Sequence, residues 1–441
     1  MRLTRILFLN ALFALFLTFS AFGVEFQPLG FESTSMGGAG VASAKGSFAT
    51  YYNPALLSLH KHKVQMSTSV SVGIREINLA DHIDKLNDVD IDSVFDLLSS
   101  SIDVNTNTGT LISQAEELRS SITTIKSELA ALSMQNGIQI MPGITVGMQI
   151  GNFGFGIYGM SEATGYAVID PDRLDVIVEK NGIYFEYDEV SNVYAISSLS
   201  EYTSRSLEYA LDNRHTYLTL AGVAYLEVPI AYGHMFSTSI GKIGVGGSIK
   251  YMPGETFSNT IDIDTESDEI IDELEDVAER TNAWGIDLGV LFKPKAVSNF
   301  TFGFVAKNIN TPEFDETTQG KYEIKPQYRA GLAYDFAKNR ITLAVDLDLK
   351  TNETFISDHD TQFLGGGINF RPLSWLSIRG GVMENLQENN EGTIFTAGIG
   401  FGLKWLQFDV AGQYSSEEGE FDGNKIPRYS RLQVAVISKW M

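Results

Sequence analysis

The second half of this sequence consists largely of segments of about ten residues in which apolar and polar side chains alternate. The same pattern is clearest earlier in the chain, from Ile144 to Ile157. Ile, Val, Met and Phe occupy every second position, Thr, Gly and Gln lie between them, and Gly151-Asn152 separates two such runs. A soluble sandwich would also alternate, but it seldom needs glycine opposite its apolar face. The pattern therefore favours a membrane β-barrel, whose apolar face contacts lipid.

The alternation predicts an all-β fold, a transmembrane antiparallel β-barrel of about 14 strands. No later stretch approaches the ~18 consecutive apolar residues of a membrane-spanning helix, so strands have to make any crossing. An even strand number places both ends of the barrel on the periplasmic side, with short turns there and long loops outside. The predicted strands span residues 64–79, 137–150, 153–168, 215–237, 242–263, 283–294, 299–309, 326–337, 340–350, 361–371, 375–385, 392–402, 404–415 and 429–440.

Residues 1–23 have the organisation of a secretory signal peptide. Arg2 and Arg5 precede an apolar run, and the small residues Ala21 and Gly23 form a cleavage site. The alternative is a single membrane anchor, but the run is shorter than the ~20 apolar residues that an anchor needs. We therefore predict cleavage after Gly23 and a location in the outer membrane of a Gram-negative bacterium.

The composition excludes several classes of partner and site. Acidic residues number 55 and basic residues 32, and two of the basic residues lie in the predicted signal peptide. This excess of negative charge argues against nucleic acid as a partner. The chain contains no cysteine, which excludes disulfides, thiolate metal sites and a cysteine nucleophile.

Two of the long connections are predicted to carry helical insertions, near residues 80–136 and 266–281. Between residues 111 and 132, apolar side chains are spaced alternately by three and four, which is typical of a heptad seam. The expected partner is the preceding stretch around Ile83 and Leu98. Residues 80–136 would then form a helical hairpin, a candidate contact surface for a protein partner.

Two short motifs lie between the predicted signal peptide and the first strand. Asn53 suits the N-cap and Pro54 the first position of a short helix. The glycines of the earlier motif allow close backbone contact, as a segment packed into a narrow lumen requires. They do not indicate a phosphate loop, because no strand and helix flank them and no Lys-Ser/Thr follows. The motif residues are Met36, Gly37, Gly38, Gly40, Asn53, Pro54 and Ala55.

These motifs carry a resemblance to a known family. A Met-Gly-Gly-Ala-Gly-Val-Ala segment followed by Asn-Pro-Ala, after a signal peptide and before a barrel, resembles the FadL-type long-chain fatty-acid channels. The chain resembles even more closely the FadL-like family named conjugal transfer protein TraF, after the F plasmid transfer operon. The resemblance extends over nearly the whole mature chain, and includes Ala306-Lys307-Asn308-Ile309, Asp346-Leu347-Asp348-Leu349 and Thr361-Gln362-Phe363.

The resemblance implies an N-terminal plug, about residues 24–63, inside a barrel that spans residues 64–441. In FadL-type channels the plug helps to gate the passage of hydrophobic molecules, which leave sideways through a gap in the wall. Residue by residue, only Asn53, Pro54 and Ala55 correspond to the plug motif. The ligand pockets of the fatty-acid channels have no motif in this sequence.

The strand faces opposite the apolar alternates predict which side chains point into the lumen. Charges of both signs in a narrow barrel are most often paired with one another or with the plug, and a polar binding site or ion path is the alternative. The predicted lumen-facing candidates are Asp346, Asp348, Arg379, Gln407, Asp409, Arg431 and Gln433.

The sequence does not indicate an enzyme. Its histidines form no HExxH motif, and no Gly-x-Ser-x-Gly elbow is present. A lipase built on barrel strands would need no local motif, and His234 would be its base. The acidic stretch 262–268 lacks the glycine and closing glutamate of an EF-hand. We predict no catalytic residues, no metal and no cofactor.

The leading functional hypothesis is a FadL-like outer-membrane channel for passive uptake of small hydrophobic compounds. Its partners would be outer-membrane lipid and a small hydrophobic ligand. The alternative is a non-transporting structural or assembly component of the outer membrane, related to conjugal transfer or secretion, in which the hairpin 80–136 contacts a protein partner.

Overall fold

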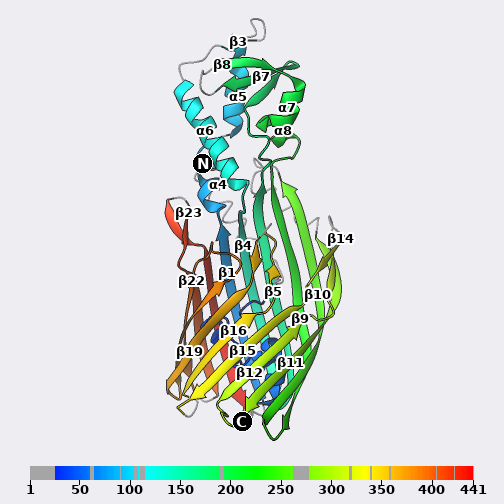
Figure 1. The fold of residues 1–441 in the computed structure, drawn as a ribbon, viewed down its shortest axis with the longest axis vertical. Helices are drawn as coiled ribbons and strands as arrows, with labels where there is room; N and C mark the ends of the chain where they lie inside the picture. The colour runs from blue at the N-terminus through cyan, green and yellow to red at the C-terminus, as the bar shows by residue number, and fades with distance from the viewer. Residues whose placement is uncertain are drawn as a thin grey trace.

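The computed structural model has two regions, a barrel and a smaller head that stands on one end of it (Figure 1). The predicted signal peptide, residues 1–23, lies outside the residues that the structure describes. The described residues are 25–59, 64–89, 91–103, 108–109, 115–188, 193–261, 278–316, 320–337, 340–356, 359–403, 405–421 and 423–440.

Fourteen antiparallel strands form a closed barrel, which confirms the predicted fold class and strand number. Each strand pairs with its neighbours along the chain, and β1 pairs with β25, Val64 opposite Trp440, to close the ring. No strand edge is left open to lipid, as a membrane requires. The strands are β1 (Val64–Ile77), β4 (Gly137–Ile150), β5 (Phe153–Val168), β9 (Tyr217–Ser237), β10 (Gly241–Ile261), β11 (Glu279–Pro294), β12 (Phe300–Lys307), β15 (Gln327–Phe336), β16 (Ile341–Asp348), β19 (Phe363–Leu373), β20 (Leu376–Asn385), β21 (Ile394–Gly402), β22 (Leu406–Ser415) and β25 (Tyr429–Trp440).

The two ends of the barrel differ in their connections. Short turns such as Gly151-Asn152 lie at one end, the turn end, where β1 begins and β25 finishes. Long connections lie at the other, the head end. Besides the head, these carry three hairpins that the alternation did not predict: β13 (Glu313–Glu316) with β14 (Gly320–Glu323), β17 (Asn352–Glu353) with β18 (Asp360–Thr361), and β23 (Glu418–Phe421) with β24 (Asn424–Pro427).

The outer wall of the barrel is apolar. Large apolar side chains at alternate strand positions are exposed around the ring, including Val70, Ile230, Leu288, Val345, Phe395 and Val434. Lipid favours such a surface, and water does not. Aromatic pairs lie on this wall: Phe153 with Tyr232, Phe300 with Tyr334, Phe401 with Phe408, and Tyr251 with Trp284. They resemble the interfacial girdles of membrane barrels.

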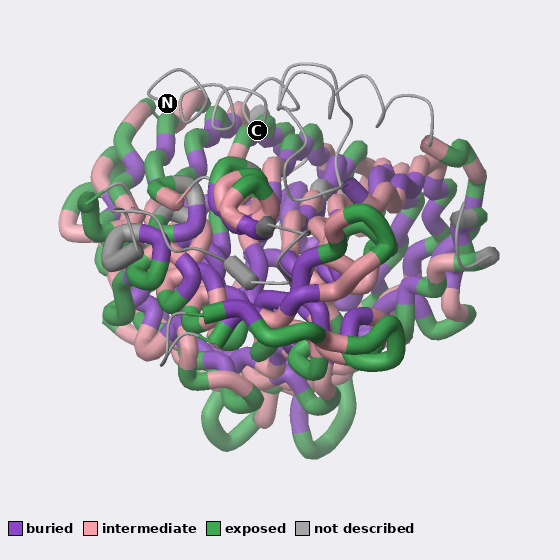
Figure 2. Tube along the Cα trace, turned by 90° about the horizontal axis from the view of Figure 1, so that it is seen from above, coloured by how far each residue is buried: buried purple, intermediate pink, exposed green. Residues whose placement is uncertain are grey.

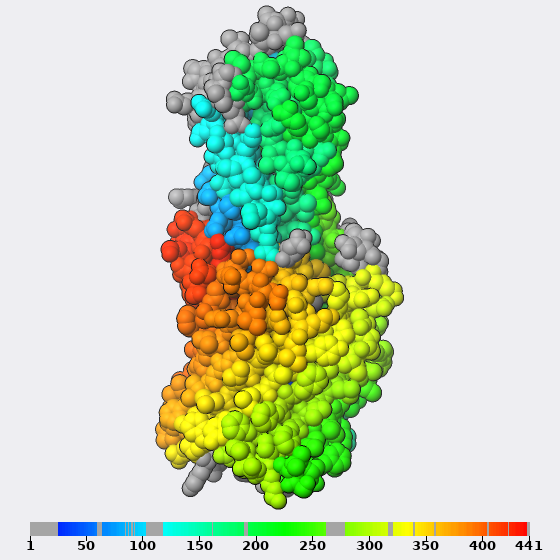
Figure 3. Space-filling view, viewed as in Figure 1, coloured from blue at the N-terminus to red at the C-terminus, as the bar shows by residue number. Residues whose placement is uncertain are grey.

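The head contains both helices and strands (Figures 1 and 3). It has its own apolar core. The predicted seam is buried: Ile122, Ile125 and Leu129 pack in one cluster with Leu86 and Leu98. No helix among the described residues is long and apolar enough to span a membrane. The head contains α4 (Ala80–Asp88), α5 (Ile91–Ser101), β2 (Ile102–Asp103), β3 (Thr108–Gly109), α6 (Ala115–Leu132), β6 (Ile177–Lys180), β7 (Ile183–Asp188), β8 (Val193–Ser197), α7 (Leu199–Arg205) and α8 (Leu207–Asp212).

Two details of the predicted insertions differ from the structure. Among the described residues, the stretch before α6 contains two helices, because the chain becomes extended at Val89. The described part of 80–136 therefore holds three helices and not a simple hairpin. The predicted helix at 266–281 lies mostly outside the described residues. Its last residues, 279–281, instead begin β11, because β10 extends far enough to pair with them, with Thr281 opposite Gly254.

Candidate functional site

Residues 25–59, the N-terminal segment, lie inside the barrel. Nearly all of them are buried, and buried chain occupies the middle of the molecule when it is seen from above (Figure 2). The segment begins near the head end, where Glu25 pairs with Arg75, and reaches the turn end, where Ser47 contacts Ser67. Its elements are α2 (Phe31–Thr34), the 3-10 turn η1 (Gly46–Phe48), α3 (Ala49–Tyr52) and the 3-10 turn η2 (Pro54–Ser58).

The glycine motif lies directly against the backbone of β19 and β20. Gly37 and Gly38 have φ angles of +64° and +77°, a left-handed conformation that favours glycine. A Cβ on Gly37 would lie 2.2 Å from the carbonyl oxygen of Val382. A Cβ on Gly365 of the wall would lie 1.9 Å from the carbonyl oxygen of Gly37. Glycine is therefore needed on both sides of this contact.

The other motif residues also meet glycines of the wall. Met36 lies against Gly367, where an added Cβ would be 2.6 Å from its Cα. Pro54 and Ala55 lie against Gly246, where a Cβ would be 2.4 Å from both backbones. The glycines of the strands thus leave space for the backbone of the segment to lie directly against the barrel wall.

Asp346 holds the glycine motif in place. Its Oδ2 accepts hydrogen bonds from the backbone N–H of Gly40 at 2.7 Å and of Val41 at 2.8 Å. The next inward residue of the strand, Asp348, instead binds the guanidinium of Arg329 at 2.5 and 2.9 Å. The two carboxylates of β16 therefore have different tasks, one binding the segment and the other neutralising a buried cation.

Asn53 caps η2 as predicted and also ties the segment to the wall. Its Oδ1 accepts a hydrogen bond from the N–H of Ala55 at 3.0 Å. Its Nδ2 lies 3.1 Å from the carbonyl oxygen of Val41, and 3.2 and 3.3 Å from those of Val290 and Phe304. The side chain thereby joins two parts of the segment to β11 and β12.

Polar side chains of the last strands bind α2 and the residues before it. Gln413 donates to the carbonyl oxygen of Thr34 at 2.9 Å, and the Thr34 hydroxyl donates to Gln433 at 2.5 Å. Arg431 reaches Gln27 at 3.5 Å. These contacts are made by side chains and not by a shared β-ladder.

Arg379, Asp409 and Gln407 form a group nearer the turn end. Arg379 Nη2 lies 2.6 Å from Asp409 Oδ1, and Gln407 donates to Asp409 Oδ2 at 2.7 Å. The Arg379 guanidinium also lies 4.8 Å from the ring centroid of Phe31. Every side chain predicted to face the lumen thus points inward in the structure. These side chains lie on four strands and do not form one site.

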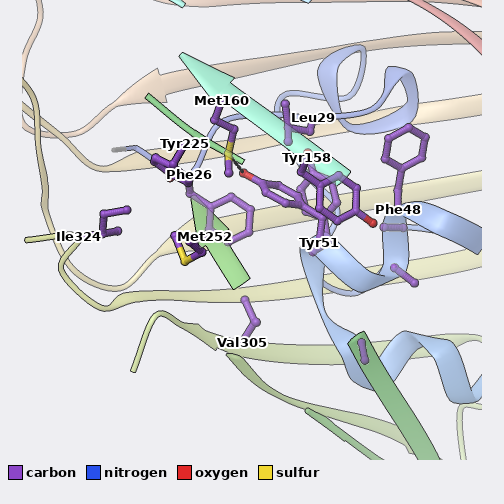
Figure 4. Packing of buried hydrophobic residues seen from close by; sticks show 14 of the residues in the cluster. Phe26, Leu29, Phe48, Tyr51, Tyr158, Met160, Tyr225, Met252, Val305 and Ile324 are labelled. Carbon is purple, nitrogen blue, oxygen red and sulfur yellow. Dashed lines mark hydrogen bonds between the residues drawn. The ribbon is translucent and has the colours of Figure 1, made fainter. Parts of the chain in front are cut away.

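An apolar and aromatic cluster occupies the interior towards the head end (Figure 4). Phe26 and Tyr51 of the segment pack with Tyr158 of β5, Tyr225 of β9 and Met252 of β10. The ring centroids of Phe26 and Tyr51 are 5.5 Å apart, and those of Tyr51 and Tyr158 are 5.6 Å apart. This part of the lumen is therefore apolar, although the interior of an open barrel channel is usually polar.

A buried ionic cluster lies beside these rings. Lys250 Nζ is 2.7 Å from Glu227 and 2.9 Å from Asp287. Lys307 Nζ is 3.6 Å from Glu227 and 3.5 Å from the ring centroid of Tyr51. All four charged side chains are at most 2% exposed. Two cations and two carboxylates balance, so the cluster joins strands β9 to β12 without adding net charge.

A second ionic network lies at the head end, where the segment begins. Arg75 pairs with Glu25 at 2.8 Å, pairs with Glu391 and donates to Gln139. His359 is buried in the connection before β19, and neither ring nitrogen has a hydrogen-bond partner among the described residues. Burial, and then the positive charge of Arg75, lower the pKa of His359 to about 2.

The hydrogen-bond ladder of the wall is interrupted at three prolines close to β5. Pairing is missing at Pro142 between β4 and β5, at Pro229 between β5 and β9, and at Pro253 between β9 and β10. Proline has no N–H to donate to a ladder. The wall therefore loses main-chain hydrogen bonds locally on this side.

The geometry does not support the lipase alternative. His234 lies on the outer face, where its ring packs between Tyr232 and Phe236, so it cannot act as a base in the lumen. No group of three or more His, Cys, Asp or Glu side chains among the described residues could hold a metal ion. The acidic stretch 262–268 lies outside those residues.

Sequence reasoning predicted the interior cations Arg379 and Arg431 but missed four others. Arg75, Lys250, Lys307 and Arg329 are all buried, and each lies at an inward position of a barrel strand. A signal was present, because each is a charged residue in phase with the lumen-facing positions of an alternating strand.

Comparison with known proteins identifies the family. A family model described as "F plasmid transfer operon, TraF, protein" matches residues 50–348, more than half of the 441 residues. The chain belongs to this family. The TraF match includes Asn53-Pro54-Ala55 and Asp346, but begins after the glycine motif. None of the curated proteins compared with the chain matches it.

Solved structures similar to this TraF-family chain include those of two toluene transporters and a FadL homologue. The Ralstonia pickettii toluene transporter TbuX is 14% identical, with a TM-score of 0.46, and the match covers 94% of this chain and 98% of that one. The Pseudomonas putida toluene transporter TodX is 12% identical, with a TM-score of 0.45 and coverage of 94% and 99%. A Pseudomonas aeruginosa FadL homologue is 9% identical, with a TM-score of 0.45 and coverage of 93% and 98%.

Proposed function

We propose that this protein is an outer-membrane channel for passive uptake of small hydrophobic compounds, with residues 25–59 as its plug. The observation that carries the proposal is the apolar and aromatic cluster inside the barrel, around Tyr51, Tyr158 and Tyr225. Sites for small hydrophobic molecules are lined mainly by apolar and aromatic side chains with a few polar groups. A water-filled pore has a polar interior.

Passage requires part of the N-terminal segment to move, because the segment occupies the lumen. The segment is held by separate side-chain contacts, such as those of Asp346, Asn53 and Gln413. A hydrogen bond between neutral groups contributes only about 0.5–1.5 kcal/mol, and one to the Asp346 carboxylate about 1.5–3 kcal/mol, so a few can be exchanged without unfolding the barrel. The missing ladder bonds near Pro142 and Pro229 support a sideways exit beside β5, of the kind that the resemblance to FadL-type channels implies.

The proposed orientation places the head outside the cell and the turn end in the periplasm. Short periplasmic turns and long extracellular loops are the rule for bacterial barrels. Protease added to intact cells should cleave the head and leave the barrel protected. Cleavage at the turn end instead would contradict the orientation.

Uptake measurements test the channel directly. We would express the protein in cells that lack their own fatty-acid channel and follow entry of a fluorescent fatty acid and a small hydrophobic dye. Gly365→Val should unseat the glycine motif, because the space beside Gly365 is filled by the Gly37 backbone, and should raise uptake several-fold. Gly380→Ala is the matched control, since its Cβ would meet only the Thr396 carbonyl oxygen at 3.7 Å. Uptake that no version of the protein increases would disprove the proposal.

Asn53→Ala should have a smaller effect than Gly365→Val, and it acts at η2, in the last part of the segment. It removes the cap and the contacts to Val41, Val290 and Phe304, and should weaken seating of the segment by about 1–3 kcal/mol. We expect faster dye uptake with an unchanged thermal transition of the barrel. Unchanged uptake at equal outer-membrane levels would remove the gating role from Asn53.

The exposed edge of the head favours a second candidate function, a structural or assembly component that contacts a protein partner. Val193 and Ile196 of the edge strand β8 are 48% and 60% exposed, although both are apolar. Val193→Ser with Ile196→Ser would then abolish cell contact or DNA transfer while dye uptake stays normal. Normal transfer in that double variant would exclude this surface.

A further inference from the structure

A cavity of about 140 Å³ lies at the turn end, between the N-terminal segment and the barrel wall. The segment contributes Phe31 and Phe48. The wall contributes Arg371 at the end of β19, Trp375 in the following turn and Gln407 of β22. The cavity lies at the opposite end of the segment from the Arg75 network, and no step of the proposed transport uses it.

Arg371 brings unused hydrogen-bond donors to this cavity. Its Nε and Nη2 atoms are buried and have no partner among the residues that the structure describes. Their two N–H groups lie on one edge of the planar guanidinium, the geometry that binds a carboxylate with two parallel hydrogen bonds. A buried donor without a partner costs about 1–3 kcal/mol, and more when it is charged. A carboxylate would satisfy both donors at once.

The charge of the cavity also suits an anion. Lys45 and Arg371 line it, and Glu32 is the acidic residue of the described lining. Glu32 accepts a hydrogen bond from Asn369 at 3.4 Å. The neighbouring Arg379 is neutralised by Asp409. Arg371 Nε and Nη2, in contrast, have no partner among the described residues, so this part of the cavity favours an anion over a second cation.

The rest of the lining is mixed, with polar Ser33, Gln65, Ser374, Ser377 and Gln407 beside an apolar part, and the volume sets the size of the ligand. In the apolar part the rings of Phe31 and Phe48 meet edge to face with centroids 5.8 Å apart, next to Trp375, Leu376 and Ile437. A cavity of about 150 Å³ lined by apolar side chains is large enough to hold benzene. The space therefore suits one ring or a short alkyl chain and is too small for a long-chain fatty acid.

We propose that this cavity binds a small organic carboxylate with an apolar body of about one ring. The carboxylate lies on Nε and Nη2 of Arg371, and the body lies among Phe31, Phe48 and Trp375. Binding here needs no movement of the segment, so the site does not depend on the proposed channel function. Dye uptake and binding at this site can succeed or fail independently.

Calorimetric titration of the purified full-length protein in detergent tests the site. Benzoate is the main probe, benzyl alcohol presents the same ring without the carboxylate, and acetate presents the carboxylate without the ring. We expect one benzoate per chain, with at least about tenfold weaker binding of the other two compounds. Absence of benzoate binding, or equal binding of benzyl alcohol or acetate, would overturn the proposal.

Arginine variants locate the site. Arg371→Gln should weaken benzoate binding at least about tenfold, because a hydrogen-bonded ion pair is lost. Arg340→Gln is the matched control: Arg340 is exposed, does not line the cavity and precedes the neighbouring strand β16. Unchanged affinity in Arg371→Gln, or an equal loss in Arg340→Gln, would contradict the assignment.

A fluorescence measurement keeps the test valid if Arg371→Gln does not fold. Benzoate should change the tryptophan emission of the native protein, because Trp375 lines the cavity. Trp375→Phe should no longer show that change, even at benzoate concentrations that saturate its own calorimetric binding. Persistence of the full emission change in Trp375→Phe would place the ligand elsewhere.

Discussion

The barrel and the head expose opposite kinds of side chain. In the head, Ile122 and Leu129 form the core, and the ion pair of Arg205 with Asp175 is 39% and 38% exposed. In the barrel, Val434 is exposed on the outer wall, whereas Lys250 is 1% exposed and lies among carboxylates. The two regions thus follow inverse patterns within one chain.

This contrast reflects the solvent that surrounds each region. Water around the head leaves apolar side chains to its core and keeps charges at its surface. Lipid around the barrel accepts apolar side chains outside, so polar and charged groups are confined to the lumen. Inside, each charge needs a partner, because a buried unpaired charge is strongly unfavourable.

The largest expected effect comes from breaking a lumen ion pair. Lys250→Met leaves Glu227 and Asp287 without their main cation and should lower the free energy of unfolding by about 3–5 kcal/mol. Arg205→Met in the head removes an exposed pair and should cost at most about 1 kcal/mol. Urea unfolding in detergent, followed by tryptophan fluorescence, measures both. Equal losses of unfolding free energy in the two variants would mean that the lumen is as accessible to water as the surface of the head.

A smaller effect is expected from shortening apolar side chains in the two regions. Leu129→Ala leaves a cavity in the core of the head and should cost about 2–5 kcal/mol locally. Val434→Ala on the outer wall creates no cavity, because lipid or detergent fills the space. Limited trypsin digestion should therefore cut the head rapidly only in Leu129→Ala, with the barrel intact in both. Rapid digestion of both would contradict a lipid-facing wall.

The smallest effect is a pH dependence at the head end of the barrel. The pKa of His359 is lowered to about 2 from an ordinary value of 6.5, so below pH 6.5 the unfolded chain binds a proton that the native state does not. Stability from this residue is complete above pH 6.5 and falls as the pH decreases towards the native pKa.

His359→Leu tests this dependence. It should lessen the loss of stability between pH 7.5 and pH 5, measured by urea unfolding at each pH. His215→Leu, in the half-buried stack of His215 on Tyr209 in the head, is the control and should leave that dependence as in the native protein. An unchanged pH dependence in His359→Leu would show that His359 is hydrated.

Alternation along the chain was enough to predict the barrel strands, their number and the direction in which their side chains point. The reason is that alternation is a local property: Ile144, Val146 and Met148 face one way in any β-strand. The helical seam of α6 and the cap of Asn53 are equally local, because three or four residues suffice to define them. The TraF resemblance rests on such local motifs.

Which residues contact one another across the lumen depends on the folded barrel. Arg75 pairs with Glu391, 316 positions along the chain, and Asp346 binds Gly40, 306 positions away. These contacts depend on closure of the ring and on how the N-terminal segment lies within it. The burial of His359 and the cavity beside Arg371 depend on the same packing. No local pattern contains that information, because the partners are brought together by strand register and by the space left inside the barrel.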